Sequence, residues 1–119
     1  MPVVRSQDKI DPGAAGRGED LFRVYCSSCH GRSAKGDGPL ADDLKVRPAN
    51  LTELSQHNDG KFPWDMVVQT IEHGRHVRGH GSEAMPAWGD AFEMVSQSEA
   101  EAQRKIDDLA NYLWSLQPK

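Results

Sequence analysis

Both cysteines of this 119-residue chain lie in the string Cys26-Ser27-Ser28-Cys29-His30. Two thiols at this spacing could form a thioredoxin-like redox pair, half of a zinc site, or the attachment point of a heme. In a heme protein, the thiols would add across the two vinyl groups of the porphyrin and form thioethers. The histidine directly after the second cysteine favours heme, because it can reach the iron from there. We therefore expect Cys26 and Cys29 to bind heme and His30 to ligate its iron.

A second candidate iron ligand lies in the string Met85-Pro86-Ala87-Trp88-Gly89. The thioether of methionine is a soft ligand that suits low-spin iron and raises the reduction potential. A methionine usually packs in a hydrophobic core, but Met85 stands among glycines and prolines rather than on an apolar helix face. We therefore predict that Met85 is the second axial ligand, whereas Met66 and Met94 are expected to be packing residues.

The histidines outside the motif leave two alternatives open; they are His57, His73, His76 and His80. Cys26 and Cys29 could form a Cys2His2 zinc site with His76 and His80, although the gap between the two halves far exceeds that of ordinary zinc fingers. One of these histidines could instead replace Met85 on the iron. Otherwise each is expected to be a solvated surface residue.

Helices are expected to position these residues, because the hydrophobic periodicity indicates helices and no strand. The spacing predicts helices over residues 12–26, 63–73 and 99–117, and Ser98 with Glu101 forms a capping box at the start of the last one. Segments 31–61 and 74–90 are rich in turn-forming residues and are expected to be loops, apart from a short helix starting at Thr52. The fold class is all-α, with residues 1–11 as a flexible leader and residues 12–119 as one domain.

The composition limits the classes of protein that the chain can belong to. Only 37% of the residues are hydrophobic, and 11 glycines and 7 prolines accompany them. A chain so polar needs a disulfide, a metal or a cofactor to fold stably. The net charge is −4 and no basic run indicates nucleic-acid binding. No stretch approaches the roughly 18 apolar residues of a membrane span, and the first ten residues lack the apolar core of a signal peptide.

The sequence resembles the class I c-type cytochromes, in the form of the small bacterial proteins with one heme. That family has a glycine and an aromatic residue eight and four residues before the first heme cysteine, where this chain has Gly18 and Phe22. Its C-terminal helix carries a leucine and an aromatic residue three apart, as do Leu109 and Tyr112. The resemblance spans residues 12–117. It implies the cytochrome c fold, in which the N- and C-terminal helices cross at the glycine and long loops wrap one covalently bound heme c.

The resemblance also implies a partner for His30. The family has a proline after the motif whose carbonyl accepts a hydrogen bond from the ligating histidine, and Pro39 is its match. The chemistry of other side chains suggests partners for the heme propionates, because Arg and Trp side chains donate hydrogen bonds to carboxylates. Arg75 and Trp88 are the favoured candidates, and the weaker ones are Arg47, Asn50, Trp64 and Arg78.

An iron with both axial positions filled has no open site for a substrate. The expected function is therefore single-electron transfer rather than enzymatic catalysis, by a monomer that makes transient contacts with a donor and an acceptor protein. Location in the periplasm fits the resemblance, although this sequence contains no export signal. Two alternatives are a heme-c domain of a larger oxidase or dehydrogenase subunit, and a heme protein in which Met85 leaves and a small ligand binds.

The charges suggest how such a protein would meet its partners. Basic residues flank the two ligand-bearing segments, and acidic residues lie on the last predicted helix, on the face expected to point outward. We predict a basic contact surface that attracts an acidic docking patch. The basic residues are Arg32, Lys35, Arg75 and Arg78, and the acidic residues are Glu99, Glu101, Asp107 and Asp108.

Overall fold

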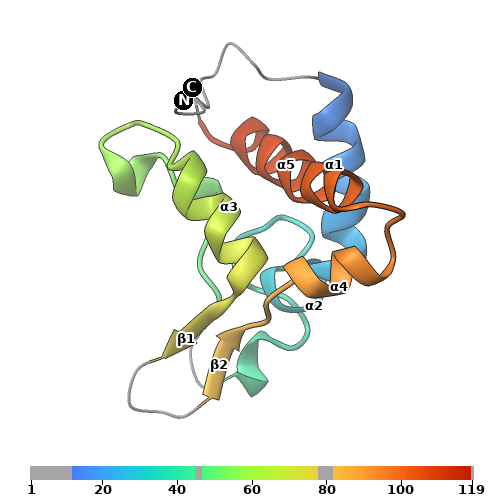
Figure 1. Cartoon of the computed structure of the whole chain (residues 1–119). Coiled ribbons are helices and arrows are strands. Elements are labelled where there is room, and N and C mark those ends of the chain that lie inside the picture. The colour runs from blue at the N-terminus through green and yellow to red at the C-terminus, as the bar shows by residue number, and fades with distance from the viewer. Residues whose placement is uncertain (1–11, 45–46, 78–81, 119) are drawn as a thin grey trace.

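The computed structural model describes residues 12–44, 47–77 and 82–118, and for residues 12, 75–77 and 82–84 it describes the backbone only. Helices dominate the fold (Figure 1). The elements are α1 (Pro12–Tyr25), α2 (Ser27–His30), η2 (Ala41–Asp43), η3 (Leu51–Glu53), η4 (Gln56–Asn58), α3 (Trp64–His73), β1 (Arg75–Val77), β2 (Ser82–Met85), α4 (Gly89–Met94) and α5 (Glu99–Ser115). The predicted leader lies outside the described residues.

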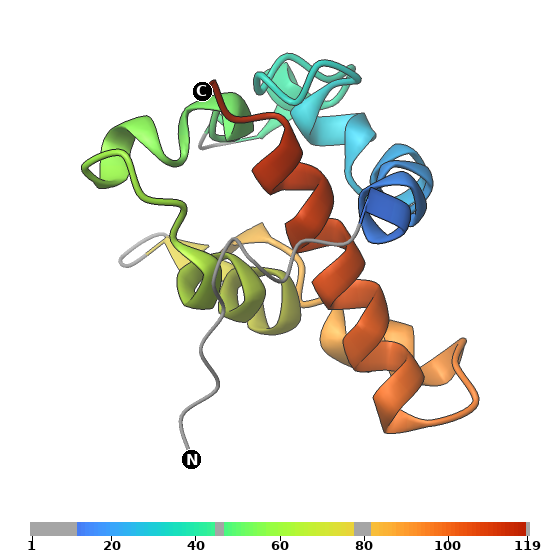
Figure 2. The same cartoon turned by 90° about the horizontal axis from the view of Figure 1, so that it is seen from above.

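The first and last helices cross and pack against each other, with α5 through the middle of the molecule and α1 at one side of it (Figure 2). Phe22 of α1 and Leu109 and Tyr112 of α5 belong to one buried core, in which the rings of Phe22 and Tyr112 lie 5.4 Å apart. An ion pair crosses the same interface, because Arg17 Nε donates to Asp108 Oδ2 at 3.0 Å. Asp108, predicted to face outward, is only 4% exposed, so that prediction is wrong.

Gly18 explains how closely α1 and α5 approach. A Cβ atom built on Gly18 would lie 2.6 Å from the carbonyl carbon of Asp108 and 2.8 Å from Cβ of Tyr112. Both neighbouring atoms belong to α5, and the first is backbone that cannot rotate away. A side chain at position 18 would therefore push the two helices apart.

The variant Gly18→Ala is expected to lower the free energy of unfolding by about 2–3 kcal/mol, because one methyl group overpacks the helix crossing. Gly16 provides a matched control in the same helix, since a Cβ there meets nothing within 4 Å. Gly16→Ala is expected to raise stability by about 0.5–1 kcal/mol through helix propensity. Urea denaturation of the two variants measures both effects, and equal shifts would contradict this role of Gly18.

The start of α5 confirms the Ser98 half of the predicted capping box, whereas the reciprocal bond to Glu101 comes from Gln97 N rather than from Ser98 N. Ser98 Oγ accepts a hydrogen bond from Glu101 N at 3.1 Å, and the Glu101 carboxylate accepts one from Gln97 N at 2.8 Å. After the helix ends, the side chain of Gln117 donates to Leu51 O at 2.6 Å and accepts from Ser55 N at 3.0 Å. The C-terminal end of α5 is thereby fixed to the long segment that was expected to be a loop.

That long segment contains short 3-10 turns rather than a longer helix. The predicted helix from Thr52 is the single turn η3, which begins after Asn50, whose side chain accepts a hydrogen bond from Thr52 N at 3.0 Å. Leu51 N donates to Ala34 O at 2.7 Å. The segment therefore lies against the residues that directly follow the Cys-His motif.

Two short elements depart from the sequence-based prediction. Strands β1 and β2 pair in antiparallel fashion with Val77 opposite Ser82 and His76 opposite Glu83, where a loop was expected. Helix α4 follows, starting at Gly89 and burying Phe92. Strands of three and four residues are too short to show alternation, and α4 begins in a glycine- and proline-rich stretch. The expectation of no strand is wrong, whereas the all-α class holds, because helices form the core.

Candidate functional site

Both cysteines and His30 lie on one helical turn at the end of α1. The backbone hydrogen bond from Cys26 N to Phe22 O, 2.9 Å long, extends the helical pattern past Tyr25. His30 N then donates to Cys26 O at 3.0 Å within the turn that contains α2. Side chains three residues apart on a helical turn emerge on the same side. The two thiols therefore share one side of this turn, and both are free and partly buried.

The environment of Cys26 disfavours a thiolate. Burial, with a smaller contribution from Cys29, raises the pKa of the Cys26 thiol to about 12. Thioredoxin-like redox pairs use a reactive thiolate, and reactive cysteines have a lowered pKa. The thioredoxin-like alternative is therefore not supported at Cys26. Among the described residues, no group of three or more His, Cys, Asp or Glu side chains could hold a metal ion. The structure does not describe the side chain of His76 or any part of His80.

The carbonyl oxygen of Ala49 orients the ring of His30. It lies 3.4 Å from Nδ1 of His30, and a carbonyl can only accept a hydrogen bond, so Nδ1 is the protonated nitrogen. Burial lowers the pKa of His30, and this effect outweighs the opposing contact with Ala49. The imidazole is therefore neutral at pH 7. In this tautomer the lone pair belongs to Nε2, the nitrogen that a metal would bind.

This contact corrects the prediction for Pro39. The carbonyl beside His30 belongs to Ala49, which is separated from Pro39 by η2. Pro39 instead lines a shallow hollow with Ser27 and Ser28, in a turn where Gly38 N donates to Cys29 O at 3.0 Å. No side-chain signal could have identified Ala49, because a backbone carbonyl is present at every residue.

Met85 ends β2, and its side chain is partly buried against the hydrophobic core. The backbone around it lies close to Gly74, where a Cβ would approach Met85 O to 2.6 Å and Ala87 N to 2.9 Å. Gly74 also has a φ of +77°, a conformation that favours glycine. Trp88 N donates to Ile71 O at 2.9 Å. The segment that carries Met85 is thus held against the C-terminal end of α3.

The two favoured propionate partners have different environments. The ring of Trp88 lies 5.4 Å from that of Tyr25 and 6.1 Å from that of Phe92, so it takes part in an aromatic cluster. Arg75 lies in β1, and its side chain is outside the description. Their contact with heme stays a prediction. The weaker candidate Arg47 has an exposed side chain 3.5 Å from Asp42.

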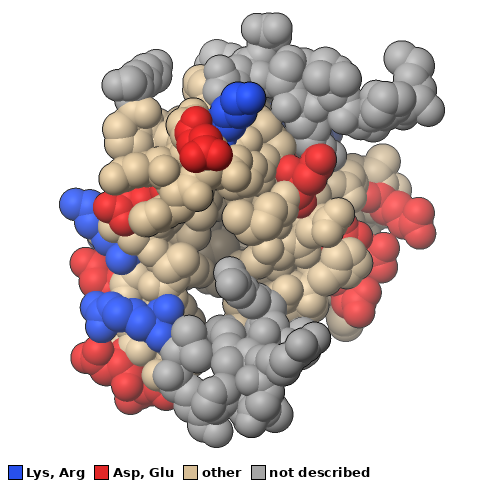
Figure 3. Space-filling model, turned by 90° about the vertical axis from the view of Figure 1, so that its left-hand side faces the viewer, with Lys and Arg blue, Asp and Glu red and all other residues tan. Residues whose placement is uncertain are grey.

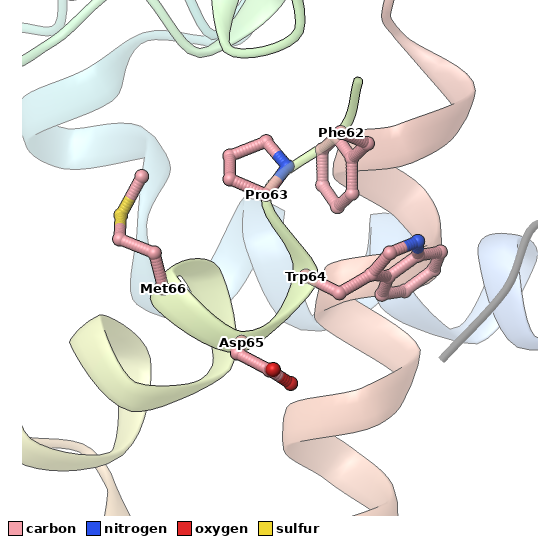
Figure 4. Close-up of a pocket in the computed structure, with 5 residues that line it drawn as sticks. All are labelled: Phe62, Pro63, Trp64, Asp65 and Met66. Carbon is pink, nitrogen blue, oxygen red and sulfur yellow. The ribbon is translucent and has the colours of Figure 1, made fainter. Parts of the chain in front are cut away.

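Trp64 has a buried donor that no described residue satisfies. Its indole Nε1 is inaccessible to solvent and has no hydrogen-bond partner within the described parts of the chain. Figure 4 shows its ring beside Phe62, 4.9 Å away, in a pocket of about 330 Å³ that Met66 also lines. Met66 and Met94 were expected to be packing residues, but they are 48% and 86% exposed, so neither is buried in the core. The face drawn in Figure 3 is hollowed near its middle.

Crossed terminal helices joined to a Cys-Ser-Ser-Cys-His turn define a c-type cytochrome domain, and the comparison with known families gives the same result. The family model described as subunit III of the cbb3-type cytochrome c oxidase matches residues 13–113. The chain therefore belongs to this cytochrome c family. Such domains carry heme c with its iron, transport electrons and are typically exported.

Several curated proteins are similar to parts of this chain. The Cbb3-type cytochrome c oxidase subunit FixP of Azorhizobium caulinodans is 34% identical over 90 residues, which cover 72% of this chain and 26% of that protein. Cytochrome c-L of Methylorubrum extorquens is 34% identical over 56% of this chain and 42% of its own length. The cytochrome bc1 complex cytochrome c subunit of Corynebacterium diphtheriae is 43% identical over 54 residues, which cover 42% of this chain and 18% of that protein. The chain thus spans less than half the length of these relatives.

Proposed function

We propose that this domain is a single-electron carrier with one heme c, attached through Cys26 and Cys29 and ligated by His30 and Met85. The observation that carries the proposal is the single helical turn that places both thiols on one side and ends in a neutral imidazole held by Ala49. The buried donor at Trp64 Nε1, which has no partner among the described residues, also suits a group that brings carboxylates into the fold. The bound heme would supply an iron that changes its charge by one.

The residues of the proposed site would have different roles at that iron. His30 would present Nε2 while Ala49 O holds Nδ1–H, a contact that fixes the ring and raises its basicity. Met85 would supply a soft thioether that favours reduced iron. Trp64, Trp88 and Arg75 would donate to the propionates. With both axial positions occupied by the chain, substrate would have no place on the metal, so the proposed role is transfer rather than catalysis.

A pair of absorption spectra tests this proposal directly. The purified holoprotein is expected to change reversibly between the ferric and ferrous spectra of a six-coordinate c-type cytochrome on addition of dithionite and ferricyanide. The ferrous protein is also expected not to bind CO at neutral pH. Rapid CO binding would instead favour the small-ligand alternative, and an absence of heme absorption would reject the proposal.

A second candidate setting is a heme-c domain that works inside a larger redox complex. Two relatives favour this setting, because the one from A. caulinodans is an oxidase subunit and the one from C. diphtheriae is a bc1 complex subunit. None of the described helices is long and apolar enough to cross a membrane. Heme staining of periplasmic and membrane fractions of the native cells distinguishes the settings. A free carrier gives a stained band in the periplasmic fraction, whereas a domain of a membrane-bound complex gives one in the membrane fraction.

Two basic residues beside the Cys-His turn support the proposal of an acidic docking patch on the redox partner. Arg32 and Lys35 are exposed next to the Cys-His turn, whereas the side chains of Arg75 and Arg78 lie outside the description. In Figure 3 basic side chains lie at the left and top, each beside acidic ones, and the right edge carries acidic ones. Since exposed charges are screened within about 10 Å at 0.1 M salt, we expect the electron-transfer rate with the partner to fall about tenfold between 10 and 150 mM salt. A rate that rises or stays constant would contradict this expectation.

A further inference from the structure

Three aromatic rings connect the heme-attachment turn to the segment that carries Met85. Tyr25, the residue before Cys26, has its ring 5.4 Å from that of Trp88 and 5.1 Å from that of Phe92. The rings of Trp88 and Phe92 are stacked at 6.1 Å. Each ring therefore contacts the other two, with edge-on contacts to Tyr25, and we call this group the Tyr25–Trp88–Phe92 cluster. Its members come from α1, from the residue before α4, and from α4.

The cluster is fixed on two sides. Phe92 is completely buried, and its backbone N donates to Trp88 O at 2.9 Å. Trp88 N donates in turn to Ile71 O of α3 at 2.9 Å. A Cβ on Gly89 would lie 2.9 Å from Glu72 O, so the start of α4 rests directly on the end of α3. Backbone contacts thus hold Trp88 to α3, while ring contacts hold it to α1.

Met85 is three residues before Trp88, and Pro86 restricts the backbone between them. A span this short allows Met85 little independent movement once Trp88 is fixed, because three residues reach about 10 Å at most. The proposed iron ligand His30 follows Tyr25 by five residues in the sequence, within the turn that follows α1. The cluster therefore sets how far the Met85 segment lies from that turn.

We infer that Tyr25, Trp88 and Phe92 are positioning residues that keep the Met85 thioether at the iron. This inference rests on the proposed function, because it takes Met85 as a ligand. Loss of the Tyr25 ring removes both edge-on contacts while leaving the bonds from Trp88 to α3 in place. The Met85 segment then moves away from the heme-attachment turn more often, and an external ligand replaces the thioether more readily.

The test is a titration of the ferric holoprotein with imidazole. Binding is monitored by the loss of the weak red charge-transfer band of methionine-ligated iron. Tyr25→Leu is expected to bind imidazole about tenfold more tightly than the unchanged protein, which corresponds to about 1.4 kcal/mol. Tyr25→Phe retains the ring and is expected to remain within twofold. Phe62→Leu is the matched control, because it alters a buried aromatic pair with Trp64 away from the Met85 segment, and it is also expected to remain within twofold.

The outcomes separate positioning from general stability. Equal imidazole affinity in Tyr25→Leu, Tyr25→Phe and the unchanged protein would overturn the inference. An equal increase in imidazole affinity in Tyr25→Leu and Phe62→Leu would also overturn it. If Tyr25→Leu does not fold, amide exchange of Trp88 N–H in the Tyr25→Phe and Phe92→Leu holoproteins replaces it. Faster exchange of the Trp88 amide is then expected only in Phe92→Leu. Equal exchange rates in the two variants would reject the inference that the cluster positions this segment. A missing charge-transfer band in the unchanged protein would instead reject Met85 ligation, which is a failure of the proposed function.

Discussion

Replacing both Cys26 and Cys29 with alanine is expected to abolish covalent heme and to leave most of the chain unfolded. Without heme the hydrophobic residues, 37% of the chain, must stabilise a fold with long irregular segments. A small domain of this kind depends on its cofactor for stability. Denaturing electrophoresis with heme staining measures the attachment, and far-ultraviolet circular dichroism measures the loss of helix.

The single variant Cys29→Ala separates the two thioethers. It is expected to retain a stained band through Cys26, with the absorption maximum of the reduced protein shifted by the vinyl group that stays unsaturated. Cys26→Ala should give the reciprocal result. If acid-acetone extracts the heme from the unchanged protein, the covalent attachment proposed here is wrong.

Replacing Met85 with alanine is expected to open the sixth coordination position and lower the reduction potential. The loss of a soft thioether removes a ligand that favours reduced iron, so a drop on the order of 0.2 V is expected within the roughly 0.8 V range that axial ligands cover. The ferrous variant should bind CO, and the red charge-transfer band of the ferric protein should disappear. Potentiometric titration and absorption spectra measure these changes.

Two exposed methionines serve as controls for Met85. Met66 and Met94 are 48% and 86% exposed, so their alanine variants should keep the potential and the band unchanged. A band that persists in Met85→Ala would show that another residue ligates the iron. His76 and His80 would then be the next residues to replace.

The helices were predictable because local signals specify them. Ser98 and Glu101 mark the start of α5, and the spacing of apolar residues locates α1 and α3 to within about two residues, the usual precision of helix ends. The resemblance also correctly assigned Gly18 to a close helix crossing. Such features were visible because each depends on a particular side chain, or on its absence, at a fixed position.

The missed features depend on contacts that have no local signature. Ala49 contacts His30 through its backbone carbonyl, so neither its identity nor its spacing indicates the contact. Asp108 was assigned to the outer face of α5 because it is charged, but Arg17 pairs with it across the helix crossing. The pairing of β1 with β2 and the burial of Phe92 in α4 likewise depend on tertiary packing rather than on propensity.

The crossing of α1 and α5 brings together segments from opposite ends of the domain, so the order of synthesis affects when the core can form. The core needs Ile106, Leu109 and Leu113. Roughly 80 residues separate Cys29 from Leu113, which at about 5–20 residues per second takes about 4–16 s to synthesise. During that time the growing chain leaves both thiols outside any packed domain, whereas the finished fold partly buries them. A chain that is still incomplete at its C-terminal end therefore offers its cysteines to modifying enzymes more openly than the folded protein does.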